Sequence, residues 1–171
     1  MTERADALYA AREDARSVSL SVELLEAALE RAFNYEHAWR LGRALFFLGQ
    51  EAQDKASARA FHLRAVKICE MATNREQLRV EGHFWLGVNW ALLAALENPL
   101  KALHHALRAR RSLRHAVHLD PAYHAAGPLR VLARLEAKLP TWLGGGRARA
   151  QADFEQALTL APDNTVTRLY F

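Results

Sequence analysis

The chain has one cysteine, Cys69, among its 171 residues, so no disulfide can form within it. Its near neighbours Val66 and Ile68 are apolar, which favours a buried, inert thiol over a nucleophile. Proline and glycine are also scarce, at five and eight residues, and they cluster between segments of regular apolar spacing. That scarcity is typical of a helical protein whose chain is interrupted only where helices end.

Long hydrophobic runs are missing as well. The most apolar stretch, Phe84–Leu96, is too short to span a membrane. The charged residues near the N-terminus are followed by no apolar run, so no signal peptide or lipid-attachment cysteine is indicated. We therefore expect a soluble protein without a membrane span, cytoplasmic as the chain stands and periplasmic if a leader has been trimmed.

The composition that remains favours helices. Alanine, leucine, arginine and glutamate dominate, and no segment alternates with period two over the length of a strand. This predicts an all-α fold in a single domain over residues 1–171. The formal charge of +4 and the isoelectric point near 9.6 permit an anionic partner without requiring one.

Apolar residues recur at helical spacing in eight segments. The predicted helices cover residues 3–16, 22–33, 36–49, 51–73, a segment that begins well before Glu81 with Thr73-Asn74 as its cap and ends near Leu96, 99–119, a segment from Tyr123 or Ala126 to Lys138, and 147–160. Ser17–Ser21 is predicted as a break in which Ser21 caps the second helix. Asn98-Pro99 starts the sixth helix, because proline suits the first turn.

The tail that begins at Thr165 is apolar and is typical of the start of another helix. It predicts either that the chain continues past Phe171 or that a short segment covers the last helix pair.

A repeated phrase organises the second half of the chain. Ala109-x3-Leu113-x2-Ala116-x4-Pro121 recurs with the same spacing as Ala150-x3-Phe154-x2-Ala157-x4-Pro162, 41 residues later. The tetratricopeptide unit ends its second helix in this way, and Leu86-Gly87-x2-Trp90 fits the phrase of its first helix. We therefore predict a tetratricopeptide-like array of about four antiparallel helix pairs, stacked into an α-α superhelix.

The segments AWRLGRALFFLG, EGHFWLGVNWALLAA, LDPAYHAAGPLRVLARLEAKLP, GGGRARAQADFEQALTLAPDN and TRLYF together resemble the TatT family. These proteins are the T-components of TRAP (tripartite ATP-independent periplasmic) transporters and are distantly similar to the regulator-of-microtubule-dynamics proteins. The resemblance implies a non-enzymatic helical-repeat accessory protein, often trimeric and typically a periplasmic lipoprotein. It also implies a solute receptor as partner and an apolar ligand.

A concave surface lined by the first helix of each pair is the main candidate site. If Gly42, Gly87 and Ala133 occupy equivalent small positions, the surface receives Trp39, Arg43, Phe46 and Phe47 from one unit, Phe84, Val88 and Leu92 from the next, and Arg130 and Arg134 from the third. An apolar groove with guanidinium groups at one end suits an amphipathic anion or a partner helix. The competing interpretation is that the apolar members are core.

A basic face on the helix 101–118 is the second candidate. It carries Lys101, His104, His105, Arg108, Arg111, His115 and His118, mostly three or four residues apart. Such a face, with Lys101, Arg108, Arg111 and His115 as its contacts, could bind a polyanion. No interleaved aromatic residues or nucleic-acid motif accompany it, which favours a solvated outer face over a nucleic-acid site.

Catalytic and metal-binding patterns are missing from the sequence. No nucleophile lies in a recognisable elbow, and Gly144-Gly145-Gly146 lacks the lysine and hydroxyl residue of a phosphate loop. His115 and His118 form a lone pair among arginines, which is poor for a dication. We therefore expect a protein that is not an enzyme and that has no metal site and no cofactor.

Overall fold

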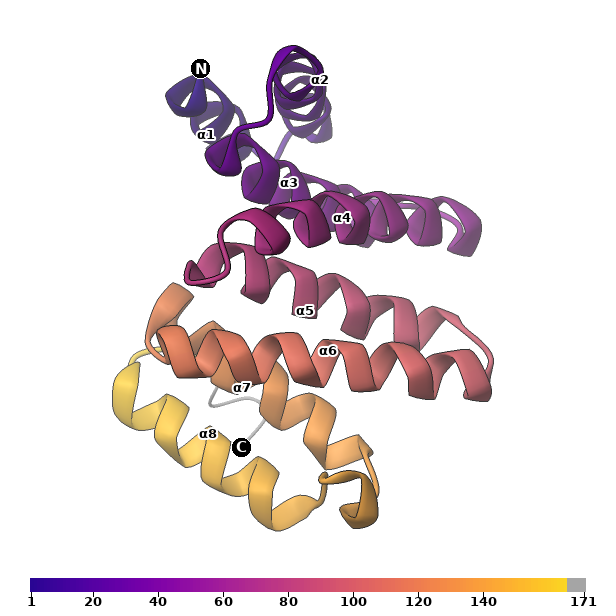
Figure 1. Cartoon of the computed structure of the whole chain (residues 1–171), viewed down its shortest axis with the longest axis vertical. Helices are drawn as coiled ribbons and strands as arrows, with labels where there is room; N and C mark the ends of the chain where they lie inside the picture. Colours follow the sequence, from indigo (N-terminus) through magenta and orange to yellow (C-terminus); the bar gives the residue numbers. More distant parts are fainter. Residues whose placement is uncertain (166–171) are drawn as a thin grey trace.

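The computed structural model describes residues 1–165, with Ala15 described through its backbone alone. Within this range the chain forms eight α-helices, one 3-10 turn and no strand, which confirms the predicted all-α class (Figure 1). The elements are α1 (Thr2–Ala10), α2 (Ala15–Arg31), α3 (Tyr35–Glu51), α4 (Lys55–Arg75), α5 (Val80–Leu96), α6 (Pro99–Leu119), α7 (Tyr123–Lys138), the 3-10 turn η1 (Thr141–Leu143) and α8 (Arg147–Leu160).

The helices stack as four pairs in chain order, from α1 and α2 at one end to α7 and α8 at the other (Figure 1). Every helix packs against the next one along the chain. In addition, the first helix of each pair contacts the first helix of the next, through α1 with α3, α3 with α5, and α5 with α7. These second contacts place α1, α3, α5 and α7 along one side of the array.

Asparagine and aspartate side chains start four of the helices. The side-chain oxygens of Asp14, Asn34, Asp54 and Asn98 each accept a hydrogen bond from a backbone N–H in the first turn that follows. The predicted start at Asn98-Pro99 is therefore confirmed, and Pro99 occupies the first turn of α6.

The N-terminal boundaries differ from the prediction. The segment 3–16 is not one helix, since α1 ends at Ala10 and α2 already begins at Ala15. Ser17–Ser21 is therefore helical. Asp14 is the cap, while the hydroxyl of Ser21 donates to the carbonyl of Ala5 across the α1–α2 contact.

The boundaries of the fourth and fifth helices differ too. The fourth helix begins at Lys55 because Asp54 caps it. It continues through Thr73 and Asn74 to Arg75, and α5 starts only at Val80, so an early start of the fifth helix was a wrong prediction.

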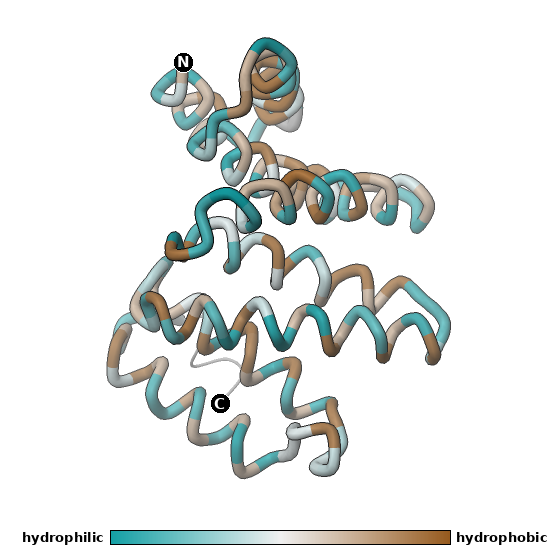
Figure 2. The backbone as a smooth tube through the Cα atoms, in the orientation of Figure 1, coloured by the Kyte–Doolittle hydropathy of each residue, from teal (hydrophilic) through white to brown (hydrophobic). Residues whose placement is uncertain are grey.

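The helices α5 and α6 differ in how polar and apolar residues are distributed along them. In Figure 2 α6 changes repeatedly between hydrophilic and hydrophobic colour along its length, as expected for a helix with one face in the core. By contrast, most of α5 is buried, because it lies between α4 and α6 and also touches α3 and α7.

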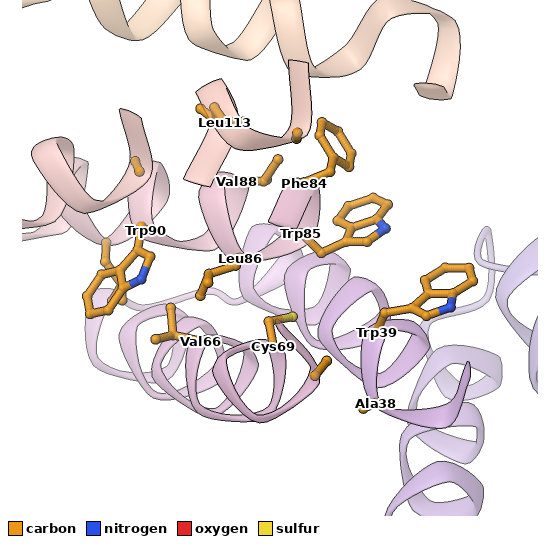
Figure 3. Close-up of a cluster of buried hydrophobic side chains, with 14 of the residues drawn as sticks. Ala38, Trp39, Val66, Cys69, Phe84, Trp85, Leu86, Val88, Trp90 and Leu113 are labelled. Carbon is orange, nitrogen blue, oxygen red and sulfur yellow. The ribbon is translucent and has the colours of Figure 1, made fainter. Parts of the chain in front are cut away.

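The main core surrounds α5, as Figure 3 shows. Its aromatic members are Tyr35, Trp39, Phe84, Trp85 and Trp90. Small residues allow the helices to approach, as the repeat pattern predicts. A Cβ on Gly42 would lie 2.2 Å from Sγ of Cys69 in α4, and a Cβ on Gly87 would lie 2.6 Å from Leu113 in α6.

The start of α7 has a backbone conformation that the sequence did not indicate. His124, Ala125 and Ala126 have φ values of 52°, 54° and 58°, in the left-handed region that non-glycine residues rarely adopt. Gly127 follows, and a Cβ there would meet the ring of Phe84 at 2.9 Å. This unusual turn therefore brings the backbone of α7 directly against α5.

The described helices include none that is both long and apolar enough to cross a membrane. The predicted further helix after Asn164 falls largely on residues 166–171, which lie outside the described part of the chain. The assignment of the whole chain to one domain stays a prediction.

Candidate ligand groove

A pocket of about 610 Å³ lies between α3, α5, α6 and α7, and we call it the groove. Most of its walls are apolar: Phe46 from α3, Val88 and Leu92 from α5, Leu103 from α6, and Val131 and Leu135 from α7. Its volume is in the range of natural ligand sites. The groove is a space among the side chains of residues 1–165, so the apolar residues of the first helices do not fill it completely.

Residues of α5 form the floor of the groove. Phe84, Val88 and Leu92 are four residues apart and therefore share one face of the helix. Phe84 and Val88 are also members of the core, with 3% and 7% of their surface exposed, whereas Leu92 is half-buried. Alanines at 91, 95, 102 and 106 also line the groove, and their small side chains leave space above the floor.

Three positive charges follow one another along the rim that α7 forms. Arg130, Arg134 and Lys138 are spaced by four residues, so they share one face of the helix. Among residues 1–165, those that line the groove include no aspartate and no glutamate. Lys138 was missed in the sequence, although its spacing from Arg134 is the signal that could have found it. The cations extend along α7 instead of gathering at one end.

Arg130 is held by neutral acceptors. Its Nη1 donates to Oδ1 of Asn164 at 2.9 Å, its Nη2 donates to the carbonyl of His124 at 3.0 Å, and its Nε is buried without a partner. Burial lowers the pKa of this guanidinium from its ordinary value, although the group stays charged at neutral pH.

His124 lies at the α1 end of the groove, together with Tyr9. Its ring is 5.6 Å from the rings of both Phe84 and Trp85, between ring centroids. Burial lowers the pKa of this imidazole, and the nearby charge of Arg130 lowers it further. The left-handed turn positions this ring, which is why sequence reasoning did not find it.

Two residues predicted for the concave surface lie behind the groove instead. Trp39 is 7% exposed, and its Nε1 donates to Oε2 of Glu36 at 3.0 Å. Arg43 forms an ion pair with Asp6 at 2.5 Å, with its guanidinium 4.0 Å from the ring centroid of Tyr9. The Arg43 contacts connect α3 to α1, whereas the Trp39 hydrogen bond lies within α3. Neither residue lines the groove.

Phe47 likewise packs against α1. Its ring is 6.3 Å from that of Tyr9, in an edge-to-face arrangement, and it belongs to the packing between the first three helices. The structure thus brings Phe46, Phe84, Val88, Leu92, Arg130 and Arg134 to one groove and leaves the other three predicted residues outside it. That any of them binds a ligand stays a prediction.

The basic face of α6 is partly neutralised by other helices. Arg108 pairs with Glu70 of α4 at 3.0 Å, and Arg110 and Arg114 approach Glu136 of α7 at 2.9 and 3.4 Å. Residues 101–118 include no aspartate or glutamate, so the carboxylates that pair with this face come from distant positions in the sequence. Lys101 and Arg111 are exposed.

His115 has a specific structural contact. Its Nε2 is 3.2 Å from the carbonyl of Gln77, which also lies 2.9 Å from Nε2 of His83. The two imidazoles are 4.2 Å apart between ring centroids. The pair therefore ties the α4–α5 loop to α6. In residues 1–165 no group of three histidine, cysteine or acidic side chains is placed to hold a metal ion.

Cys69 of α4 is fully buried, and its Sγ faces Gly42 of α3. Burial raises the pKa of its thiol strongly, so the reactive thiolate is disfavoured. This agrees with the predicted inert core thiol.

The stacked helix pairs define the class of protein. The fold is similar to that of a solved structure, TTC0263, a thermophilic tetratricopeptide-repeat (TPR) protein of Thermus thermophilus, with a TM-score of 0.68. The match covers 97% of this chain and 78% of that chain at 21% sequence identity. This is a TPR-like helical-repeat protein.

Comparison with models of known protein families shows the family to which the chain belongs. The profile of "Regulator of microtubule dynamics protein 1-3" matches residues 1–128, which is 128 of the 171 residues. The chain therefore belongs to this family, and the distant similarity expected from the sequence is confirmed. No curated protein gave a significant match.

Proposed function

We propose that this protein is a non-enzymatic binding adaptor whose ligand or partner segment occupies the groove between α3, α5, α6 and α7. The observation that carries the proposal is the pocket of about 610 Å³ with an apolar floor and a basic rim. Helical-repeat proteins present such concave surfaces to their partners. Apolar walls with a few convergent polar groups are also the usual composition of a binding site.

The proposed contacts are Phe46, Phe84, Val88 and Leu92 for apolar groups, and Arg130 and Arg134 for negative charge. Trp39 and Arg43 are proposed in a supporting role, Trp39 as a member of the main core and Arg43 through its ion pair between α3 and α1. Burial of apolar surface would drive binding, and the cations would orient the ligand.

The test is a titration with the amphipathic anion 1-anilinonaphthalene-8-sulfonate, followed by fluorescence. Ala91→Trp puts a large ring into the groove, while Ala27→Trp adds the same ring to the exposed face of α2 as a matched control. We expect Ala91→Trp to lose dye binding and Ala27→Trp to retain it, with both melting temperatures close to that of the parent. Equal dye binding by the two variants would refute the groove as the binding site.

The more specific role proposed is that of a TRAP-transporter T-component, with a solute receptor as protein partner and a trimeric assembly in the periplasm. It is supported by the TatT-like sequence segments and by the helical-repeat fold. Co-purification with a solute receptor encoded beside the gene, and a trimer mass in light scattering, are the expected results. A gene neighbourhood without a transporter or receptor would count against this role.

The alternative proposal is polyanion binding along α6, through Lys101, Arg108, Arg111 and His115. The exposure of Lys101 and Arg111 supports it, whereas the pairing of Arg108 with Glu70 weakens it. Retention on heparin that is lost only at high salt, and that Arg111→Glu abolishes, would favour this alternative. Elution at low salt would eliminate it.

A further inference from the structure

A second pocket, of about 850 Å³, lies between α4, α5 and α6, and we call it the α4–α6 pocket. Its volume is in the range of small-molecule sites, and its walls are mostly polar. The basic and histidine side chains that line it are Arg111, Arg114, His115 and His118 of α6 and His83 of α5. It shares no lining residue with the groove, so what it binds does not depend on the proposed function.

The charged side chains that line the α4–α6 pocket are mostly positive. Within residues 1–165 the acidic lining is Glu70 alone, and Arg108 already pairs with it at 3.0 Å. Arg114 lies 3.4 Å from Glu136, whose closer partner is another arginine of α6. Arg111 forms no ion pair within residues 1–165. An anionic ligand would therefore balance charge that the described part of the chain leaves unbalanced.

His83 and His115 form the wall of the pocket next to Gln77. Nε2 of each ring lies within hydrogen-bond distance of the Gln77 carbonyl oxygen, at 2.9 and 3.2 Å. A carbonyl oxygen only accepts hydrogen bonds, so both imidazoles carry a hydrogen on Nε2 and, when neutral, a lone pair on Nδ1. A further proton therefore enters at Nδ1 of either ring.

Protonation of one imidazole opposes protonation of the other, because the ring centroids are 4.2 Å apart. Burial lowers the pKa of His83, and the charge of His115 lowers it further, against the opposite effect of the Gln77 carbonyl. Within residues 1–165 the other titratable or charged groups lining the pocket are Glu70 of α4 and Arg111, Arg114 and His118 of α6. All of these except Glu70 disfavour additional positive charge, whereas a bound anion would favour it.

A phosphate group fits this set of side chains. Near neutral pH it carries a charge of about −1.5 to −2 and three acceptor oxygens. The guanidinium of Arg111 offers N–H donors in a planar fork that matches phosphate oxygens. A carboxylate has a single charge, so it would offset one cation and leave the histidine pair as it is. The volume of the pocket leaves room for the rest of a small molecule.

We propose that the α4–α6 pocket binds the phosphate group of a small phosphorylated molecule, with Arg111 as its main contact and with uptake of a proton by the pair His83 and His115. Binding and proton uptake are linked, so the affinity for an anion of constant charge rises as pH falls through the range in which imidazoles titrate.

The test is isothermal titration calorimetry with inorganic sulfate, which has the shape of phosphate and keeps its double charge near neutral pH. We expect sulfate to bind about fivefold more tightly at pH 6.5 than at pH 7.5, since each proton taken up changes the affinity by up to about tenfold per pH unit. Glycerol 3-phosphate should bind as well, and glycerol should not.

Three variants assign the binding to this pocket. Arg111→Ala should weaken sulfate binding by about tenfold at both pH values, because a charge-assisted contact is lost. Arg4→Ala, on the exposed face of α1, is the matched control and should leave binding unchanged. His115→Gln keeps a donor for the Gln77 carbonyl and should remove most of the dependence on pH. Melting temperatures close to that of the parent check that each variant folds.

The inference is overturned if neither sulfate nor glycerol 3-phosphate binds at pH 6.5, or if Arg111→Ala binds sulfate as tightly as Arg4→Ala does. Binding of equal strength at the two pH values would overturn it too. Retention on heparin without binding of either small anion would overturn it in favour of the polyanion alternative. Ala91→Trp alters the groove and should leave sulfate binding unchanged, so failure of this inference and failure of the proposed function are distinguishable.

Discussion

Substituting Gly42 by alanine would test how closely α3 and α4 must approach. A Cβ at this position would lie 2.2 Å from Sγ of Cys69, far inside normal contact. Its next neighbours, the carbonyl oxygen of Ala65 and the Cβ of Cys69, would be at ordinary contact distances of 3.8 and 3.9 Å. The sulfur is therefore the single obstacle, and Cys69 is fully buried, which limits where that atom can move.

The magnitudes follow from two opposing effects. Overpacking a filled core lowers the free energy of unfolding by about 1–3 kcal/mol. Replacing glycine by alanine inside a helix raises it by about 1 kcal/mol. Gly42→Ala should therefore lower the free energy of unfolding by about 1 kcal/mol in the parent protein. In a Cys69→Ala background the obstacle is gone, so the same change should raise it by about 1 kcal/mol, a coupling of about 2 kcal/mol.

Urea denaturation followed by circular dichroism measures the four free energies of unfolding in this cycle. Ala60→Gly, on the exposed face of α4, is the matched control for helix propensity and should cost about 1 kcal/mol in both backgrounds. If Gly42→Ala has the same effect with and without the sulfur, the close approach of α3 and α4 at Cys69 is refuted.

Three further predictions concern buried polar groups. Asn89→Ala should destabilise the protein by about 2 kcal/mol in urea denaturation, because Nδ1 of the buried His62 loses its 2.9 Å hydrogen bond to the Asn89 side chain; an unchanged denaturation midpoint would contradict this. Arg110→Ala should cost about 3 kcal/mol, measured in the same way, because Glu136 would keep a buried charge without its 2.9 Å partner; a loss typical of a surface pair would show that Arg114 suffices. Burial, and then the charge of Glu136, raise the pKa of Asp153 to about 6, so the folded protein retains a proton that the unfolded chain releases above about pH 4. The stability that this group contributes therefore falls as pH rises from about 4 to 6. Asp153→Asn should stabilise the protein by about 1 kcal/mol at pH 7, after allowance for solvent screening, and by much less at pH 4. Thermal unfolding at the two pH values checks this difference.

Local signals predicted most of the helices. The last helix was predicted at its observed bounds, and Asn98 caps α6 at the start that its position indicated. Errors arose where two caps competed, since Asp14 rather than Ser21 starts α2. Which of two nearby polar residues caps a helix depends on contacts such as that between Ser21 and Ala5, which are not local in sequence.

The candidate site was predicted in part for a similar reason. Helical spacing placed Phe84, Val88 and Leu92 on one face of α5, and the groove lies over that face. Spacing could not show that Arg43 forms an ion pair with Asp6, a residue 37 positions away. Nor could it show that Glu70 and Glu136 partly neutralise the basic face of α6. Partners distant in sequence decide which charges remain available.

The amino-acid sequence by itself determined that this protein is a stack of helix pairs. The periodic apolar faces and the repeated small residues at Gly42 and Gly87 are compatible with little else, because an unpaired amphipathic helix cannot bury its apolar face alone. The tertiary structure alone decided that an apolar space stays open over α5 and that Arg130, Arg134 and Lys138 border it. The open space depends on the distances of α3, α6 and α7 from α5. Those distances are set by the packing of all the helices together, so no single segment of the sequence predicts them.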